Sequence, residues 1–135
     1  MTTLKTILGL STVVMLVGCQ VKPSDEPLTQ LNGSEIKALF VGKTVESFNV
    51  ISGSSSFTYY AKNGQIQQER YWEERKGVWK VNNKDEICLS MEGKEFRCRG
   101  IYRQGDKIYK YRLSDAGQLE KVIRYRQFID GNTLE

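Results

Sequence analysis

Cys88 and Cys98 are the pair of residues whose spacing most directly indicates chemistry. They flank a turn signal at residues 92–94, where a three-residue hairpin loop would pair Met91 with Glu95. Counting outward along antiparallel strands places Cys88 directly opposite Cys98, at a separation that a disulfide can span. The chain contains no histidine, so two thiols alone would not complete a closed zinc site. The spacing predicts a cross-strand disulfide, which is typical of an oxidising compartment.

The rest of the sequence lacks the residue sets that most enzymes use. Without histidine, neither a Ser-His-Asp nor a Cys-His arrangement can form, and no glycine-rich phosphate loop is present. The paired acids Glu73-Glu74 and Asp85-Glu86 fall near expected turns, where solvated charges are usual. We therefore expect a protein that is not an enzyme, with no catalytic residues, no cofactor and no metal.

The third cysteine, Cys19, has a different setting. An apolar run over 7–17 follows Lys5 and is shorter than the roughly 20 residues of a membrane-spanning helix, but long enough for a secretory signal. It leads into Leu16-Val17-Gly18-Cys19, which resembles the lipobox of bacterial prolipoproteins. The resemblance implies cleavage before Cys19 and attachment of lipid to that residue, and Gln20 after it implies sorting to the outer membrane.

The predicted lipoprotein signal divides the chain into three parts. We expect residues 1–18 to be a lipoprotein signal peptide and residues 19–32 to be a lipidated cysteine with a flexible tether. Both prolines of the chain lie in that second part, among polar residues. Residues 33–135 then form a single β domain that faces the periplasm.

Basic residues are concentrated near the C-terminus. Residues 94–126 contain ten lysines or arginines and four acidic residues. One interpretation is a contact surface for an anionic envelope ligand, with Arg97, Arg99, Arg124 and Arg126 as candidate contacts; the other is a solvated strand face that discourages aggregation. Nucleic acid is not an expected partner outside the cytoplasm.

The predicted register places two of these arginines on a face that also carries apolar residues. Arg97 and Arg99 share it with Ile87, Leu89 and Met91. A bulge or a one-residue slip could separate the two sets. Otherwise these arginines point into the interior of a barrel, where they could contact a ligand.

One short helix and a series of strands would position these residues. Residues 33–42 predict the helix, with Ser34 as a cap, Ile36, Leu39 and Phe40 on one face, and Gly42 at its end. The strands are predicted at 44–51, 56–61, 65–72, 77–81, 86–91, 95–103, 107–113 and 119–129. The fold class is mainly all-β: a small antiparallel meander or lipocalin-like barrel of 7–8 strands with one short N-terminal helix. The alternative is a bent open sheet packed on that helix.

A set of ordered motifs carries a family resemblance. They are residues 31–44 (LNGSEIKALFVGKT), 57–64 (FTYYAKNG) and 77–81 (GVWKV), then Ile87-Cys88, Cys98 and Gly131-Asn132. Together they resemble the proteobacterial family described only as domain of unknown function 995. The resemblance implies a small exported β domain and supplies no catalytic residues.

The sequence thus predicts a non-enzymatic lipoprotein anchored in the outer membrane by its N-terminal lipid. Its β domain would bind an envelope protein or a small anionic ligand in the periplasm. Two alternatives stay open. Ser52-Gly53 followed by Tyr59 weakly resembles the inhibitory loop of membrane-bound lysozyme inhibitors, and Gly77-Val78-Trp79 resembles a lipocalin motif that would indicate a carrier.

Overall fold

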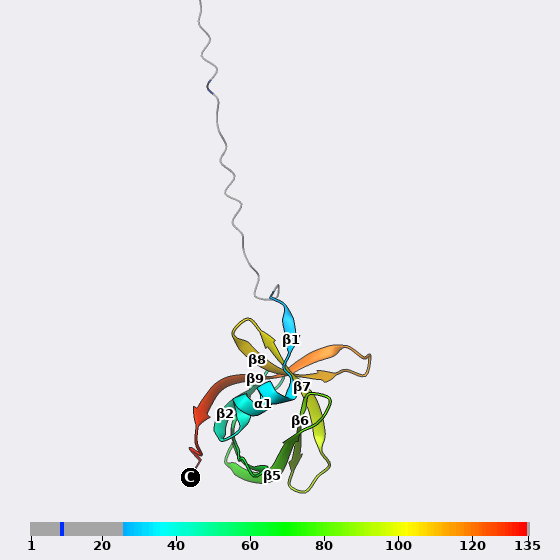
Figure 1. The fold of residues 1–135 in the computed structure, drawn as a ribbon. Coiled ribbons are helices and arrows are strands. Elements are labelled where there is room, and N and C mark those ends of the chain that lie inside the picture. Colours follow the sequence, from blue (N-terminus) through cyan, green and yellow to red (C-terminus); the bar gives the residue numbers. More distant parts are fainter. Residues whose placement is uncertain (1–8, 10–25, 135) are drawn as a thin grey trace, which may run out of the picture.

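The protein is a small antiparallel β-barrel closed at one end by a helix. The computed structural model describes residues 9 and 26–134. In chain order its elements are β1 (Leu28–Gln30), α1 (Gly33–Phe40), β2 (Lys43–Asn49), β3 (Ser55–Tyr60), β4 (Gln65–Arg70), β5 (Glu73–Val81), β6 (Glu86–Met91), β7 (Arg97–Gln104), β8 (Lys107–Leu113) and β9 (Leu119–Asp130). Figure 1 shows the strands curving around α1. The predicted fold class, a barrel of 7–8 strands with one short helix, is confirmed.

One pairing between distant parts of the chain, that of β2 with β9, closes the barrel. From β2 to β9, each strand pairs with the next strand in the sequence. In addition, β2 pairs with β9. The strand β9 in turn pairs with β8, and β8 with β7, so the sheet has no free edge between β2 and β9. The closed ring leaves none of β2 to β9 as an edge strand, which reduces the aggregation hazard of an open sheet.

The extra strand β1 lies in the range predicted to be tether. Leu28 to Gln30 pair with Gln104 to Tyr102 of β7, and the next residue, Leu31, is buried in the core. The folded domain therefore begins before residue 33. Burial of Leu31 in the core holds the preceding polar residues 28–30 against β7. The signal peptide and Cys19 lie outside the described residues.

Helix α1 is fixed at its first turn by a capping box. The Asn32 side chain accepts a hydrogen bond from the Glu35 N–H (2.9 Å), and Glu35 accepts one from the Asn32 N–H (3.1 Å). Asn32, and not Ser34, is therefore the cap, and the prediction was wrong by two residues. The Gly33 N–H also donates to Asp85 (2.8 Å), which joins the helix to the β5–β6 turn. No helix in the described part of the chain is both long and apolar enough to cross a membrane.

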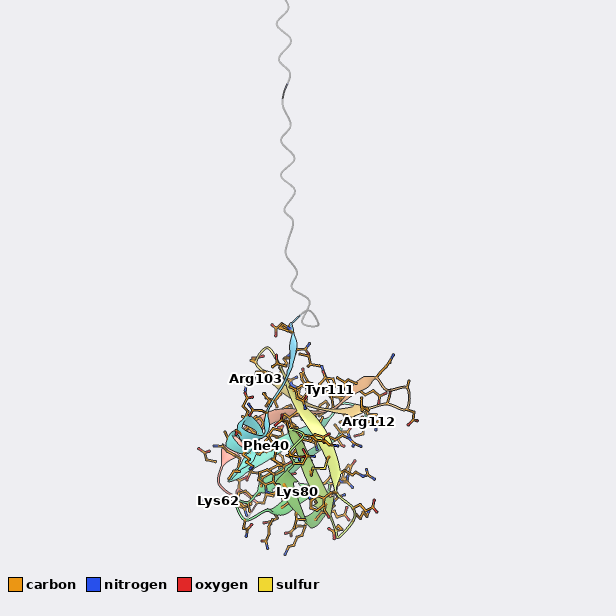
Figure 2. All side chains as sticks on the ribbon, turned by 45° about the vertical axis from the view of Figure 1, so that its right-hand side comes forward. Phe40, Lys62, Lys80, Arg103, Tyr111 and Arg112 are labelled. Atoms are coloured by element: carbon orange, nitrogen blue, oxygen red, sulfur yellow. A yellow bond between two sulfur atoms is a disulfide. The ribbon has the colours of Figure 1, made fainter. Side chains whose placement is uncertain are left out.

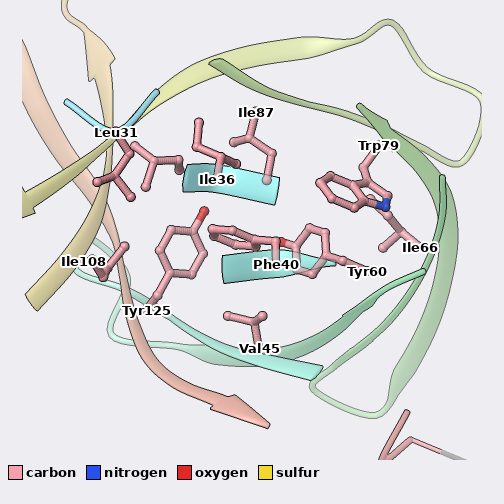
Figure 3. Close-up of a cluster of buried hydrophobic side chains, with 11 residues drawn as sticks. Leu31, Ile36, Phe40, Val45, Tyr60, Ile66, Trp79, Ile87, Ile108 and Tyr125 are labelled. Atoms are coloured by element: carbon pink, nitrogen blue, oxygen red, sulfur yellow. The ribbon is translucent and has the colours of Figure 1, made fainter. Parts of the chain in front are cut away.

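The apolar core fills the end of the barrel that α1 covers. Figure 3 shows Phe40 of α1 at its centre, between Tyr125, Tyr60 and Val45. The Phe40 ring meets the rings of Tyr60 and Tyr125 edge to face, at 5.0 Å between centroids in each case. Trp79 packs on Tyr60 and donates its indole N–H to the Ala61 carbonyl (2.9 Å). These contacts seal this half of the barrel.

The hairpin of β6 and β7 has the predicted register. Cys88 pairs with Cys98, their sulfur atoms form a disulfide, and their Cα atoms are 4.0 Å apart. No bulge or slip intervenes, since Ile87 pairs with Arg99 and Leu89 with Arg97 on either side. Arg97 and Arg99 therefore share the inner face of the barrel with Ile87 and Leu89 and are not turned away from it by a bulge or a slip.

Candidate functional site

The inner face of the barrel changes from apolar to basic along its strands. In β4, Ile66 belongs to the core and is followed on the same face by Gln68 and Arg70. In β8, Ile108 belongs to the core and is followed by Lys110. Successive side chains of a strand alternate between faces, so residues two apart point the same way. Each strand therefore contributes an apolar residue to the sealed end and a polar one to the other half.

We call the other end of the barrel the mouth. It is formed by the hairpin turns at residues 50–54, 71–72, 92–96 and 114–118, because consecutive antiparallel strands bring alternate turns to one end. Inside it lies a cavity of about 830 Å³, within the range of small-molecule sites. Its lining includes basic, hydroxyl and apolar side chains: Arg70, Arg75, Lys94, Arg97, Lys110; Ser47, Ser54, Ser56; Leu89, Met91, Ile123.

The cavity is strongly electropositive. Five basic residues line it, and Glu95 is the one acidic residue among the described lining. The ion pairs found in residues 26–134 lie elsewhere and join Lys43 to Asp130, Arg112 to Glu120 and Arg126 to Glu46. Among the described residues the cavity cations therefore have no carboxylate partner within an ion-pair distance. Arg70, Arg75 and Lys110 are partly buried, whereas Lys94 and Arg97 are exposed, and partly desolvated cations without a counter-charge favour an anion from solution.

Several polar atoms of the cavity wall are buried without a hydrogen-bond partner. They are the Nε atoms of Arg70 and Arg75 and the Oε1 atom of Gln68. Gln68 donates its amide N–H to the Thr58 hydroxyl (3.0 Å), while its amide oxygen is buried in the wall without a partner. Unpaired buried polar groups are uncommon in folded proteins and call for a partner such as a ligand or an ordered water.

Lys110 lies deepest among the cavity cations. Its strand neighbours on the inner face are Ile101 of β7 and Ile123 of β9. Burial, together with the smaller effect of the nearby Arg99 charge, lowers the pKa of the Lys110 ammonium to about 8. A group with this pKa changes its charge close to neutral pH, and an anion beside it would favour the charged form.

The four predicted arginines are divided by the barrel wall. Arg97 lines the cavity, and Arg99 lies on the same inner face opposite Ile87 of the core. Arg124 and Arg126 flank the inward Tyr125 and lie on the outer face instead. Arg126 pairs with Glu46 (3.2 Å) and covers the Phe48 ring at 4.3 Å, so it is already occupied. The structure thus assigns only Arg97 and Arg99 to the interior.

Most other charged side chains surround the barrel. Lys62, Lys80 and Arg103 are exposed, and Figure 2 shows Lys62 at the edge of the molecule, whereas Phe40 lies near its centre. This distribution is the usual one, since charged side chains of folded proteins mostly face solvent. The inner basic residues are therefore an exception to the general placement of charge in this molecule.

Sequence reasoning missed Arg70, Arg75, Gln68 and Lys110. The available signal was alternation: Ile66-x-Gln68-x-Arg70 and Ile108-x-Lys110 each place polar residues in line with a core residue. Arg75 similarly lies two residues before Gly77 and four before Trp79. This signal becomes informative only when the inner face of each strand is known.

Within the described residues, no group of three or more Cys, Asp or Glu is placed to hold a metal ion. The lipid-bearing role predicted for Cys19 concerns a residue outside that range. Comparisons with family models, with curated proteins and with solved structures find no match to this chain, so its resemblance to domain of unknown function 995 stays a prediction.

Proposed function

We propose that this protein is a non-enzymatic binding protein that takes up a small anionic ligand through the mouth of its barrel. The observation that carries the proposal is the set of unpaired cations in the cavity, Arg70, Arg75, Arg97 and Lys110. Desolvating several like charges in one cavity is costly unless an anion compensates them. A cavity built for water alone would be expected to hold neutral polar side chains.

The proposal places this activity on a lipid-anchored domain of the bacterial envelope. The support for that setting is the motif ending at Cys19 and the disulfide between Cys88 and Cys98. The mouth and β1 lie toward different ends of β7, since β1 pairs with its last residues and the turn before its first residues belongs to the mouth. A chain that enters through β1 would leave the mouth open to solutes.

Calorimetric titration of the full chain with inorganic phosphate and with citrate tests the proposal. We expect saturable binding that weakens as salt is added, because the interaction is between charges. The double variant Arg70→Gln and Arg75→Gln should bind about tenfold more weakly or worse. Arg126→Gln removes a positive charge from the outer face and is the matched control.

Equal losses in the Arg126→Gln variant would show that the cavity is not the site. Equal binding of neutral glucose would contradict the requirement for an anion. Both measurements use the same protein preparation and the same buffer, so they separate location from charge.

A further inference from the structure

The exposed apolar side chains of the barrel are concentrated at the mouth. Among the described residues, ten large apolar side chains are exposed, and seven of them lie on the four mouth hairpins: Val50, Ile51, Tyr71, Trp72, Phe96, Leu113 and Leu119. The three others, Leu28, Phe57 and Val78, are scattered over β1, β3 and β5. Apolar groups that gather at one place on a surface usually mark a contact with apolar matter.

The turn between β4 and β5 displays this feature most clearly. Trp72 is 99% exposed, and Tyr71 before it has a φ of 59°, a conformation that bulky residues rarely adopt. Backbone strain of this kind is found where function maintains it. The turn holds the largest apolar side chain of the mouth entirely in solvent, where it contributes nothing to the core.

The two halves of the barrel therefore differ in polarity. The sealed half is apolar; in the open half Lys110 lies within its strand, Arg70 and Arg97 lie beside mouth turns, and exposed apolar side chains lie on the same mouth hairpins. Two apolar side chains of the lining, Leu89 and Met91, lie two residues apart on β6 and so follow one another toward the mouth. Ile123 of β9 and Ser47 of the adjacent β2 line another part of the cavity.

The size of the cavity argues in the same direction. A volume of about 830 Å³ is that of a drug-sized ligand, and a bare oxyanion would leave most of it unfilled. A ligand that fills it must satisfy the cations with one part and contact apolar side chains with another.

We propose that the ligand is a single-chain anionic amphiphile, an inference that rests on the proposed function. Its head would lie among Arg70, Arg75, Arg97 and Lys110. Its chain would run past Leu89 and Met91 to the mouth hairpins. The shared chemistry is a carboxylate or phosphate head on an alkyl chain. The head gains charge-assisted hydrogen bonds from the guanidinium and ammonium groups of the residues that line the cavity. The chain gains free energy by covering apolar surface at the mouth.

Titration of the full chain with three probes tests this inference, each below its micelle-forming concentration. Decyl phosphate carries head and chain, inorganic phosphate carries the head alone, and decyl maltoside carries the chain on a neutral head. We expect decyl phosphate to bind at least about tenfold more tightly than either of the others. Decanoate against acetate repeats the comparison with a carboxylate head.

The outcomes separate this inference from the proposed function. If inorganic phosphate binds as tightly as decyl phosphate, the amphiphile is overturned while the anion site stands. If decyl maltoside binds as tightly as decyl phosphate, the charge is irrelevant and the proposed function falls. If no probe binds, both fall.

A variant at the mouth tests the chain separately from the head. Trp72→Ser should weaken the binding of decyl phosphate severalfold and leave the binding of inorganic phosphate unchanged. Trp72 is fully exposed, so its replacement should not disturb folding. Val78→Ser removes an exposed apolar side chain from the outer wall and is the control. Equal effects of the two variants on decyl phosphate would overturn the role of the mouth.

Discussion

The two halves of this barrel are built from the same strands but differ in what fills them. In the sealed half, Phe40 of α1 inserts among Tyr60, Tyr125 and Trp79, and every large side chain has an apolar neighbour. In the open half, the same strands turn inward Gln68, Arg70, Arg75 and Lys110, several of whose polar atoms have no partner. The packing of the sealed half thus supplies the stability that allows polar atoms of the open half to remain without hydrogen-bond partners.

Removing Phe40 should have the largest effect on stability. Phe40→Ala leaves a cavity at the centre of the sealed half, and we expect a loss of about 3–5 kcal/mol in the free energy of unfolding. Urea denaturation followed by tryptophan fluorescence measures it. Phe57→Ala, on the outer wall, is the control and should cost less than about 1 kcal/mol. Similar losses in both variants would contradict the division into halves.

Removing the disulfide should have the next largest effect. Cys88→Ser with Cys98→Ser frees a short loop at the mouth, and the chain-entropy estimate for such a loop is about 2–3 kcal/mol. Reduction of the native protein should give a similar loss, and the reduced double variant should show no further change. A variant as stable as the native protein would show that β6 and β7 hold their register unaided.

Replacing Lys110 should stabilise the protein, unlike any change in the sealed half. Lys110→Met removes a charge whose desolvation lowers the pKa of this lysine. We expect the free energy of unfolding at pH 7 to rise by about 1–3 kcal/mol. This range is smaller than the full pKa shift would give, because part of the residue stays accessible in the cavity. Ligand binding should weaken in the same variant. A loss of stability would show that the ammonium has a partner in the folded state.

The pH dependence of stability gives a second test of Lys110. Below pH 8 the lysine is protonated in both states, so its penalty is constant. Between the folded pKa of about 8 and the unfolded value of 10.5, the unfolded chain binds more protons, and stability rises with pH. Above pH 10 the buried Tyr60 and Tyr125, whose pKa values are raised by burial, act in the opposite direction. The rise between pH 8 and 10 should be absent from Lys110→Met.

Anion affinity should show the reverse dependence. Because the ammonium of Lys110 must be charged to attract an anion, binding of decyl phosphate should weaken severalfold as pH rises through about 8. Lys110→Arg keeps its charge throughout this range and should bind with little dependence on pH. Parallel curves for the two proteins would remove Lys110 from the site.

The smallest effect is expected at the capping box of α1. Asn32→Ala leaves the Glu35 N–H without its side-chain acceptor and should cost about 1 kcal/mol. Ser34→Ala, the residue that the sequence pattern favoured, is the control and should be close to neutral. Thermal unfolding of the two variants distinguishes them.

Local patterns in the sequence were sufficient for most of the barrel. Alternation and turn residues placed seven of the eight predicted strands within two residues of their observed bounds, and the spacing of Cys88 and Cys98 predicted the β6–β7 register. The strand predicted at 77–81 instead begins at Glu73, so Glu73 and Glu74, which were expected near a turn, belong to β5. The same patterns failed at Tyr71 and Trp72, which were predicted to extend a strand because aromatic residues favour strands; in the structure these residues form the turn that exposes them. They also missed β1, whose pairing with β7 joins segments far apart in the chain.

The sequence by itself determined the composition of the site but not its location. The abundance of arginine and the absence of histidine are properties of the chain, and they fix which side chains are available to a site. Which arginines lie inside depends on the pairing of β2 with β9 and of β8 with β7 and β9, and on bulges in β9 that shift its register. Only closure of the barrel brought Arg70, Arg75, Arg97 and Lys110 around one cavity and left Arg124 and Arg126 outside, because residues distant in sequence share a cavity only through tertiary contacts.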